Sequence, residues 1–293
     1  MFLDLTVIGL GWTFNMYFPT FFFDTLWALG VSMVALSLLI YLPYYIILII
    51  GCLIVAAHNL LDNFHVTGNN LKAFLWDELH DQRVFNFHGH TLVTAYPVLS
   101  WIGIIALGYC FGAVYKKEFT AIKRKKWLIW IGSSAITLFI ILRALNIYGD
   151  MQPWAYQKSS VFTFLSFLNV TKYPPSLLYS LITLGPAILF LAFAEKPLNA
   201  FTKFISTYGR VPMFYYLLHI FLIHFIAMVA AQLTGFGWKA MVIDDFPQIK
   251  GFGFSLIIIY LIWIGLIMAL YPLCKWYDKY KTAHKEKWWL SYL

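Results

Sequence analysis

Charged residues are scarce in this chain. Asp, Glu, Lys and Arg together make up 12% of its 293 residues, whereas 61% are hydrophobic. Soluble domains carry about 25% charged residues, so this composition excludes an ordinary soluble domain. The apolar segments occupy most of the chain and leave no separate soluble module. We therefore expect a single membrane domain over residues 1–293.

Cysteine is scarce as well, and it is not spaced for metal binding. Cys52, Cys110 and Cys274 lie within or at the edge of apolar segments. This pattern excludes a disulfide framework and a cysteine-ligated zinc site. We expect the three side chains to serve in packing.

Long hydrophobic runs are what the chain has in abundance. About 20 apolar residues cross the hydrocarbon core as a helix, and in lipid an open backbone finds hydrogen-bond partners only within helices or closed barrels. We predict an all-α polytopic membrane helix bundle with seven to eight transmembrane helices. The predicted spans cover residues 25–41, 44–61, 91–115, 127–147, 175–194, 212–234 and 252–274, with a shorter apolar segment at 2–18 as the candidate eighth.

The basic residues predict the orientation of these helices. Fourteen Lys and Arg residues lie in the connections 116–126 and 195–210 and after residue 274, whereas six lie in the alternate connections. By the positive-inside rule the first set is cytoplasmic, including a basic tail at 275–293. Because these clusters flank apolar segments, the net charge of +8 does not indicate a nucleic-acid partner.

Lys and Arg are absent from the first 71 residues. The first short connections of a polytopic protein usually carry the charges that orient it, and a signal peptide would need a basic start. We therefore expect the chain to be truncated at its N-terminus.

Ionisable residues inside spans are sharper signals of function, since each is costly in lipid and normally faces a cavity or a partner. Arg143 lies near the outer end of its span, where it either snorkels to the interface or binds an anion. His219 and His224 share one span but point about 140° apart, so they do not form a chelating pair. Each is either a buried, hydrogen-bonded histidine or a catalytic group.

Several histidines fall at the predicted outer boundary. His58 and Asn59 end the second long span with Asp62 one turn later, a cluster that a helix-terminal cap would explain. His88 and His90 flank a glycine, and without a third ligand this pattern is weak support for a metal site. We predict instead that the stretch re-enters the membrane surface and frames an entrance.

The predicted outer connection 149–173 is long, aromatic and nearly devoid of acid. A connection of this size is often a lid or a binding segment. Its aromatic residues fit either a belt at the membrane interface or a platform that stacks on sugars, and the belt is the simpler interpretation.

Three segments together resemble a known family. "HGHTLVTAYPVLSWIGIIALGYCFGAVY", "FLNVTKYPPSLLYSLITLGP" and "YGRVPMFYYLLHIFLIH" are similar to the bacterial membrane proteins grouped with the catalytic domain of heparan-alpha-glucosaminide N-acetyltransferase. The resemblance runs from "FLDLTVIGLGWTFN" to about residue 270. It implies a transmembrane acyltransferase that takes an acetyl group from cytosolic acetyl-CoA and delivers it to an extracytoplasmic acceptor, such as a sugar amine or hydroxyl.

The chain departs from the family pattern at its start. Family members usually begin with further helices that carry an "SIDxxRG" segment, an Asp-His pair and an "AP-x-F-x-F-x-x-G" segment, and none of these is present here. The family's presumed catalytic histidine lies in that region and maps onto no residue of this chain. This agrees with the expected truncation and leaves open whether the chain is active alone.

The resemblance implies roles for the residues that remain. Arg210 would bind the phosphates of acetyl-CoA, since guanidinium groups pair well with phosphate. His219, His88 and His90 would be the catalytic candidates, because an imidazole suits the removal of the acceptor's proton. The candidates for substrate binding are Arg143, Asn59, Tyr96, Trp101 and Lys172. No metal is expected.

Other functions stay open. A transporter or flippase for a small or lipid-linked solute would use ionisable groups along a path, and a structural or regulatory membrane subunit is a third alternative. We expect a bacterial inner membrane location with a cytoplasmic C-terminus. The expected partners are membrane lipids and a small-molecule or glycan acceptor, with a homodimer as one candidate assembly.

Overall fold

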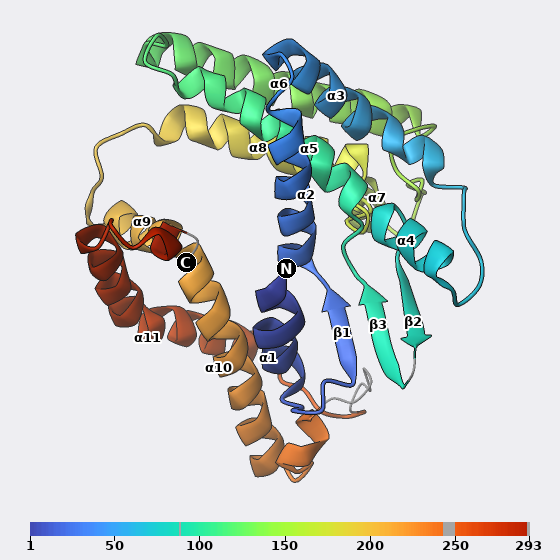
Figure 1. Ribbon diagram of the computed structural model, residues 1–293, viewed down its shortest axis with the longest axis vertical. Coiled ribbons are helices and arrows are strands. Elements are labelled where there is room, and N and C mark those ends of the chain that lie inside the picture. Colours follow the sequence, from blue (N-terminus) through green and yellow to red (C-terminus); the bar gives the residue numbers. More distant parts are fainter. Residues whose placement is uncertain (88, 243–249, 292–293) are drawn as a thin grey trace. The chain divides into compact units, whose positions relative to one another are not determined.

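The computed structural model consists mainly of helices with a small β-sheet (Figure 1). It describes residues 1–87, 89–242 and 250–291. The α-helices are α1 Gly9–Thr13, α2 Thr25–Leu39, α3 Tyr44–Ala57, α4 Leu71–Leu79, α5 Val98–Phe111, α6 Ala121–Leu145, α7 Ser160–Leu168, α8 Leu177–Ala194, α9 Ala200–Arg210, α10 Pro212–Leu233 and α11 Leu256–Ala283. The short π and 3-10 segments are η1 Asp4–Ile8, η2 His58–Leu61, η3 Gly112–Tyr115, η4 Trp238–Met241 and η5 Trp288–Ser291.

Six helical segments in the described ranges are long and apolar enough to cross a membrane, which supports an integral membrane protein. They are Tyr44–Leu61, Val98–Tyr115, Ala121–Leu145, Leu177–Ala194, Pro212–Leu233 and Leu256–Ala283. The predicted count of seven to eight is not confirmed. α2 has only 15 residues and reaches about 22 Å, which is shorter than a hydrocarbon core of about 30 Å.

A three-stranded sheet accompanies the helices, and the all-α prediction did not include it. The strands have the order β1-β3-β2, and β2 pairs antiparallel with β3. Phe87 lies opposite His90 and Arg83 lies opposite Thr94. The strands are β1 Thr20–Phe23, β2 Arg83–Phe87 and β3 His90–Thr94.

The predicted span 91–115 is wrong at its beginning. Residues 91–94 belong to β3, and α5 starts only after Pro97. The β-branched residues Thr91, Val93 and Thr94 favour a strand. A proline is pre-organised to begin a helix, so the helical part of the span is shortened at this point.

The chain divides into two compact units. Unit 1 contains residues 1–4 and 22–196, and unit 2 contains residues 5–21 and 197–293. The single domain predicted over 1–293 stays a prediction. The predicted basic tail from residue 275 begins inside α11, because that helix continues to Ala283.

In unit 1, α3 and α5 pack closely because each carries a glycine at the contact. A Cβ added to Gly103 would lie 2.8 Å from a side-chain carbon of α3, and one added to Gly51 would lie 3.0 Å from a side chain of α5. Small residues allow two apolar helices to approach in this way. The contact anchors α3 and thereby positions the polar residues that follow its last turn.

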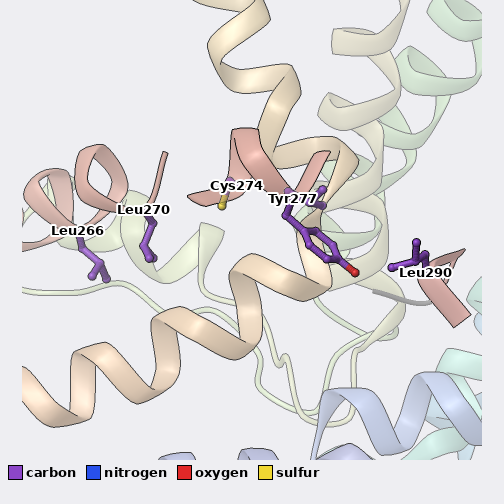
Figure 2. Close-up of a cluster of buried hydrophobic side chains, with 6 residues drawn as sticks. Leu266, Leu270, Cys274, Tyr277 and Leu290 are labelled. Atoms are coloured by element: carbon purple, nitrogen blue, oxygen red, sulfur yellow. The ribbon is translucent and has the colours of Figure 1, made fainter. Parts of the chain in front are cut away.

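In unit 2, α9, α10 and α11 share an apolar core (Figure 2). Tyr277 of α11 stacks on Phe214 of α10 with ring centroids 4.1 Å apart. Cys274 is fully buried in this core and Cys110 is buried in unit 1, in agreement with the predicted packing role, whereas Cys52 is exposed. The buried members of the core are Val211, Leu266, Leu270, Cys274, Tyr277 and Leu290.

Candidate functional site

Two histidines and a carboxylate come together in unit 1, where α3 ends. α3 is apolar up to Ala57 and continues as the 3-10 turn η2, which carries His58 and Asn59 and is followed by Asp62. His58 is 3% exposed and Asn59 is 7% exposed. One side-chain nitrogen of His58 lies within 4.8 Å of a carboxylate oxygen of Asp62.

The second histidine comes from α4. Asn70 caps this helix by accepting a hydrogen bond from a backbone N–H of its first turn (3.0 Å), and the helix ends at His80, which is 3% exposed. Nε2 of His80 lies 3.2 Å from Oδ1 of Asp62. The rings of His80 and His58 meet edge to face with centroids 5.6 Å apart. We call His58, Asn59, Asp62 and His80 the His58–His80 cluster.

Asn59 holds the carboxylate of the cluster in place. Its Nδ2 donates to Oδ2 of Asp62 at 2.9 Å, and its Oδ1 accepts from the backbone N–H of Leu177 at 2.9 Å. Both ends of the amide are therefore used, and α8 fixes the orientation of Asp62 through Asn59. The predicted contact of Asn59 with a substrate stays a prediction.

The imidazoles of the cluster are incompletely hydrogen-bonded. Among the described residues, neither ring nitrogen of His58 nor Nδ1 of His80 makes a hydrogen bond of normal geometry, although the backbone of Pro175 interacts with the His58 ring. One potential ligand atom from each of His58, Asp62 and His80 lies within 4.8 Å of the other two. Because buried polar groups are nearly always paired, three unpaired nitrogens beside a carboxylate indicate a site that acts on, or binds, something further.

Another buried carboxylate lies on α4. Glu78 is 8% exposed, and its Oε2 accepts from Nε1 of Trp27 at 2.7 Å. Burial raises the pKa of Glu78 to about 7, against a smaller lowering effect of the Trp27 bond. A carboxyl group that titrates near neutrality is suited to accept or donate a proton. Sequence analysis did not select Glu78, since nothing in "DELHDQR" marks which acid is buried.

Three predicted substrate-binding residues meet in unit 1. The hydroxyls of Tyr96 and Tyr173 lie 3.0 Å apart, and the ring of Tyr96 lies 6.1 Å from that of Trp101. Nζ of Lys172 lies 4.8 Å from the Tyr173 ring centroid and 5.9 Å from that of Tyr96. Hydrogen bonding to Tyr173 raises the pKa of Lys172 to about 12. The structure thus assembles a cationic aromatic group suited to bind a polar acceptor.

Arg143 is occupied by the chain itself. It is 2% exposed, and its guanidinium donates to the backbone carbonyls of Gln152, Ser166, Phe167 and Asn169 at 2.6–3.1 Å. These bonds hold the 149–173 connection, which contains α7, against the end of α6. They favour a structural role over both snorkelling and anion binding, and the predicted substrate contact of Arg143 stays a prediction.

The two histidines of α10 each have a carbonyl partner in unit 2. Nδ1 of His219 lies 3.1 Å from the carbonyl oxygen of Tyr215, and the two rings stack at 4.9 Å. Nε2 of His224 lies 2.7 Å from the carbonyl oxygen of Met241. These contacts match the predicted alternative of a hydrogen-bonded structural histidine. The catalytic role of His219 stays a prediction.

The predicted entrance histidines are placed only in part. His88 lies outside the described residues. His90 is exposed at the start of β3, and among the described residues it belongs to no group that could hold a metal ion. Of the described residues around His88, those up to Phe87 belong to β2 and those from His90 belong to β3, and the catalytic role of His88 and His90 stays a prediction.

Arg210 lies at a basic pocket of unit 2. Its Nε and one terminal nitrogen bind both carboxylate oxygens of Asp278 at 2.8 and 2.7 Å. The pocket has a volume of about 480 Å³ and is lined by Arg210, Asp278, Lys281, Thr282, His284, Lys285, Lys287, Trp288 and Leu290. Because Asp278 neutralises Arg210, a phosphate in this pocket would pair mainly with the lysines.

The most complete site thus contains residues that sequence analysis did not select as functional. His58 and Asp62 were interpreted as a cap, and His80 was not singled out. The available signal was the four-residue spacing in "HNLLD" at the end of an apolar span, where ionisable groups are costly. His80 carried no such signal, because only tertiary folding brings it 18 residues back to Asp62.

Comparison with known proteins returned no match: no family model, no curated protein and no solved structure is significantly similar to this chain.

Proposed function

We propose that the protein is a membrane acyltransferase that moves an acetyl or longer acyl group from acyl-CoA to a small-molecule or glycan acceptor. The observation that carries this proposal is the pairing of buried His80 with Asp62 beside the unpaired imidazole of His58. A carboxylate that accepts from one imidazole nitrogen leaves the other nitrogen free to take a proton, as in other acid-base pairs.

The reaction requires one proton to move twice. The acceptor amine or hydroxyl attacks the thioester carbonyl, a C–N or C–O bond forms, and the C–S bond breaks. We assign proton removal to Nδ1 of His80, which has no hydrogen-bond partner among the described residues. The proton then passes to the leaving thiolate of CoA. Asp62 holds the His80 ring and stabilises its charged form.

Acceptor binding is assigned to groups of the same unit. Tyr96, Trp101 and Lys172 combine stacking surfaces with a cation, which suits a sugar or another hydroxylated acceptor. The charge pattern predicts that these groups face the extracytoplasmic side of a bacterial inner membrane, with the C-terminus in the cytoplasm.

Independently of the chemistry assigned to unit 1, we assign recognition of the phosphates of CoA to the basic pocket of unit 2. CoA carries several phosphate charges, and Lys281, Lys285 and Lys287 supply cations around a pocket of about 480 Å³. The pocket also contains Trp288 and Leu290, which offer an apolar surface. We expect Lys285→Ala to raise the Kd for CoA without changing the fold.

Acyl transfer by the purified full chain tests the proposal. The chain is reconstituted in liposomes with radiolabelled acetyl-CoA and a panel of amino and hydroxy sugars, and both CoA thiol release and labelled product are measured. We expect His80→Gln to lower the rate about 10²–10⁴-fold. The exposed pair partner His65, 2.7 Å from Asp81, supplies the control His65→Gln, which keeps the rate.

Two results would overturn the proposal. Absence of product with every acceptor, together with accumulation of unmodified solute in the liposomes, would favour the transporter alternative. If His80→Gln leaves the transfer rate unchanged, the His58–His80 cluster takes no part in the reaction.

A further inference from the structure

We propose that His58, Asp62 and His80 form a binding site for one divalent first-row transition metal ion, with Zn²⁺ as the reference ion. The inference concerns the cluster used in the proposed function, but its main test is metal binding and does not depend on acyl transfer. It departs from the expectation that no metal is bound.

The first argument is the placement of the ligand atoms. One atom each from His58, Asp62 and His80 lies within 4.8 Å of the others, and Nε2 of His80 is already 3.2 Å from Oδ1 of Asp62. Zinc bonds of about 2.0–2.1 Å place tetrahedral ligand atoms roughly 3.4 Å apart. The His80–Asp62 edge fits without change, and the remaining edges close by at most about 1.5 Å, which is within reach of side-chain rotation.

The second argument is the state of the histidine nitrogens. His58 is 97% buried, and neither of its ring nitrogens makes a hydrogen bond of normal geometry among the described residues, although the backbone of Pro175 interacts with the ring. It lies four residues before Asp62, with its ring next to that of His80. A buried imidazole with such weak pairing is costly, and coordination of a metal ion through a ring nitrogen removes that cost.

The third argument is the support behind the carboxylate. Nδ2 of Asn59 donates to Oδ2 of Asp62, and Leu177 donates to Asn59 in turn. Oδ2 is therefore held while Oδ1 faces His80. Hydrogen-bonded carboxylate ligands of this kind are typical of metal sites, where such supports orient the ligand.

The ligand set selects the class of ion. Two imidazoles and one carboxylate suit Zn²⁺ and its neighbours such as Co²⁺ and Fe²⁺, whereas Ca²⁺ and Mg²⁺ prefer six or more oxygen ligands. The group that could hold a metal contains no cysteine, so soft ions such as Cu⁺ are disfavoured. Three protein ligands leave a coordination position open, as in catalytic zinc sites.

The site also implies regulation of the proposed reaction. A metal ion bound through Nε2 of His80 displaces the hydrogen bond to Asp62 and places positive charge next to Nδ1, so it opposes uptake of the acceptor's proton at Nδ1. We expect saturating Zn²⁺ to inhibit acyl transfer by the purified chain and a chelator to restore it.

Metal content and spectroscopy test the site directly. The full chain is purified in detergent, stripped with chelator and dialysed against Zn²⁺ or Co²⁺, after which metal content and Co²⁺ visible absorption are measured. We expect one tight ion per chain and a Co²⁺ spectrum of low-coordinate nitrogen and oxygen ligands. His58→Ala, His80→Ala and the near-isosteric Asp62→Asn should each lose at least 100-fold in affinity, and Asn59→Ala about 10–100-fold.

The chain supplies a matched control. His65 and Asp81 form a histidine–carboxylate pair at 2.7 Å outside the cluster, and His65→Ala should leave the stoichiometry at one. Circular dichroism and gel filtration verify that Asp62→Asn is folded. Absence of tight binding in the unsubstituted chain, or equal binding in folded Asp62→Asn, would overturn the site.

The two proposals fail in distinguishable ways. One bound Zn²⁺ without any acyl transfer, in both stripped and loaded protein, overturns the proposed function and supports the metal site. Acyl transfer without tight Zn²⁺ binding supports the proposed function and overturns the metal site. Transfer that requires Zn²⁺ supports the metal site and removes His80 from the role of base.

Discussion

The histidines of the two units differ in burial and in hydrogen bonding: His58 of unit 1 is buried, whereas His219 and His224 of unit 2 are partly exposed. In unit 2, His219 and His224 each contact a backbone carbonyl, at 3.1 and 2.7 Å. In unit 1, His58 makes no hydrogen bond of normal geometry among the described residues and has only a weaker interaction with the backbone of Pro175, although it is more deeply buried. A paired histidine stabilises the fold around it, whereas an unpaired one beside a carboxylate is available to a ligand or a proton.

Arg143 extends the comparison to a fully paired cation, and it should give the largest effect on stability. Arg143→Met removes a guanidinium that donates to four carbonyls. We expect the free energy of unfolding to fall by about 3–5 kcal/mol, because buried groups that lose a partner are costly. Thermal unfolding in detergent measures this, and Arg143→Lys should recover only part of the loss, since an ammonium cannot reproduce the planar fork.

Asp4 is a buried carboxylate with hydrogen bonds to only one of its oxygens among the described residues. We expect it to make the stability of the protein depend on pH. Its Oδ2 accepts from the backbone N–H groups of Trp27 and Asp24, whereas its buried Oδ1 has no partner among the described residues. Burial raises the pKa of Asp4 from 3.8 to about 6. The folded state therefore favours the protonated form, so the contribution to stability is complete below pH 4 and is lost as pH rises through 6.

Asp4→Asn should remove this dependence. The raised pKa of Asp4 corresponds to a change of about 3 kcal/mol at most in the free energy of unfolding. We expect the melting temperature of Asp4→Asn, measured relative to that of the unsubstituted protein, to rise between pH 4 and pH 7. A constant difference over that range would show that Asp4 is ionised in the folded protein throughout.

Replacement of a histidine by leucine should have opposite effects on stability in the two units. His224→Leu leaves the Met241 carbonyl without its partner and should destabilise the chain by about 1–3 kcal/mol. His58→Leu removes nitrogens that have no partner and should stabilise chelator-treated protein by about 1 kcal/mol. Denaturation of both variants in the same detergent provides the measurement. Destabilisation of the same size in both variants would contradict the distinction between His224, which has a carbonyl partner, and His58.

The cap of α4 should give the smallest effect. Asn70→Ala removes the side chain that accepts from the first turn and should cost about 1 kcal/mol. Because α4 carries His80, we also expect weaker Zn²⁺ binding. Asn199→Ala removes the equivalent cap of α9 in unit 2 and should cost about the same without altering metal affinity.

Local composition predicted much of the helical fold. The apolar runs 44–61 and 212–234 correspond closely to the helical segments Tyr44–Leu61 and Pro212–Leu233. The run that starts at 91 contains a strand, because apolar content alone does not separate a β-branched stretch from a helix. β2 and β3 are neighbours in the sequence and pair locally, whereas β1 pairs with β3 across more than 60 residues, a pairing that no local pattern indicated.

The candidate site was predictable only in fragments. Three of the five predicted substrate-binding residues, Tyr96, Trp101 and Lys172, meet in the structure, although Lys172 comes from a connection more than 70 residues away. His90, by contrast, was chosen for a local pattern, and the structure leaves it exposed at a strand end. Residue type identifies what a side chain can do, but burial and partners determine whether it remains free to do it.

By itself the sequence determined a helical membrane protein, because its long apolar runs find stable partners for their backbone only as helices in lipid. It also determined the four-residue spacing of His58 and Asp62. Only the tertiary structure decided that His80 joins them, that Asn59 holds the carboxylate, and that Arg143 and His224 are already paired. The physical reason is that hydrogen bonds between distant segments depend on how helices pack, and that packing is not encoded in any single stretch of the chain.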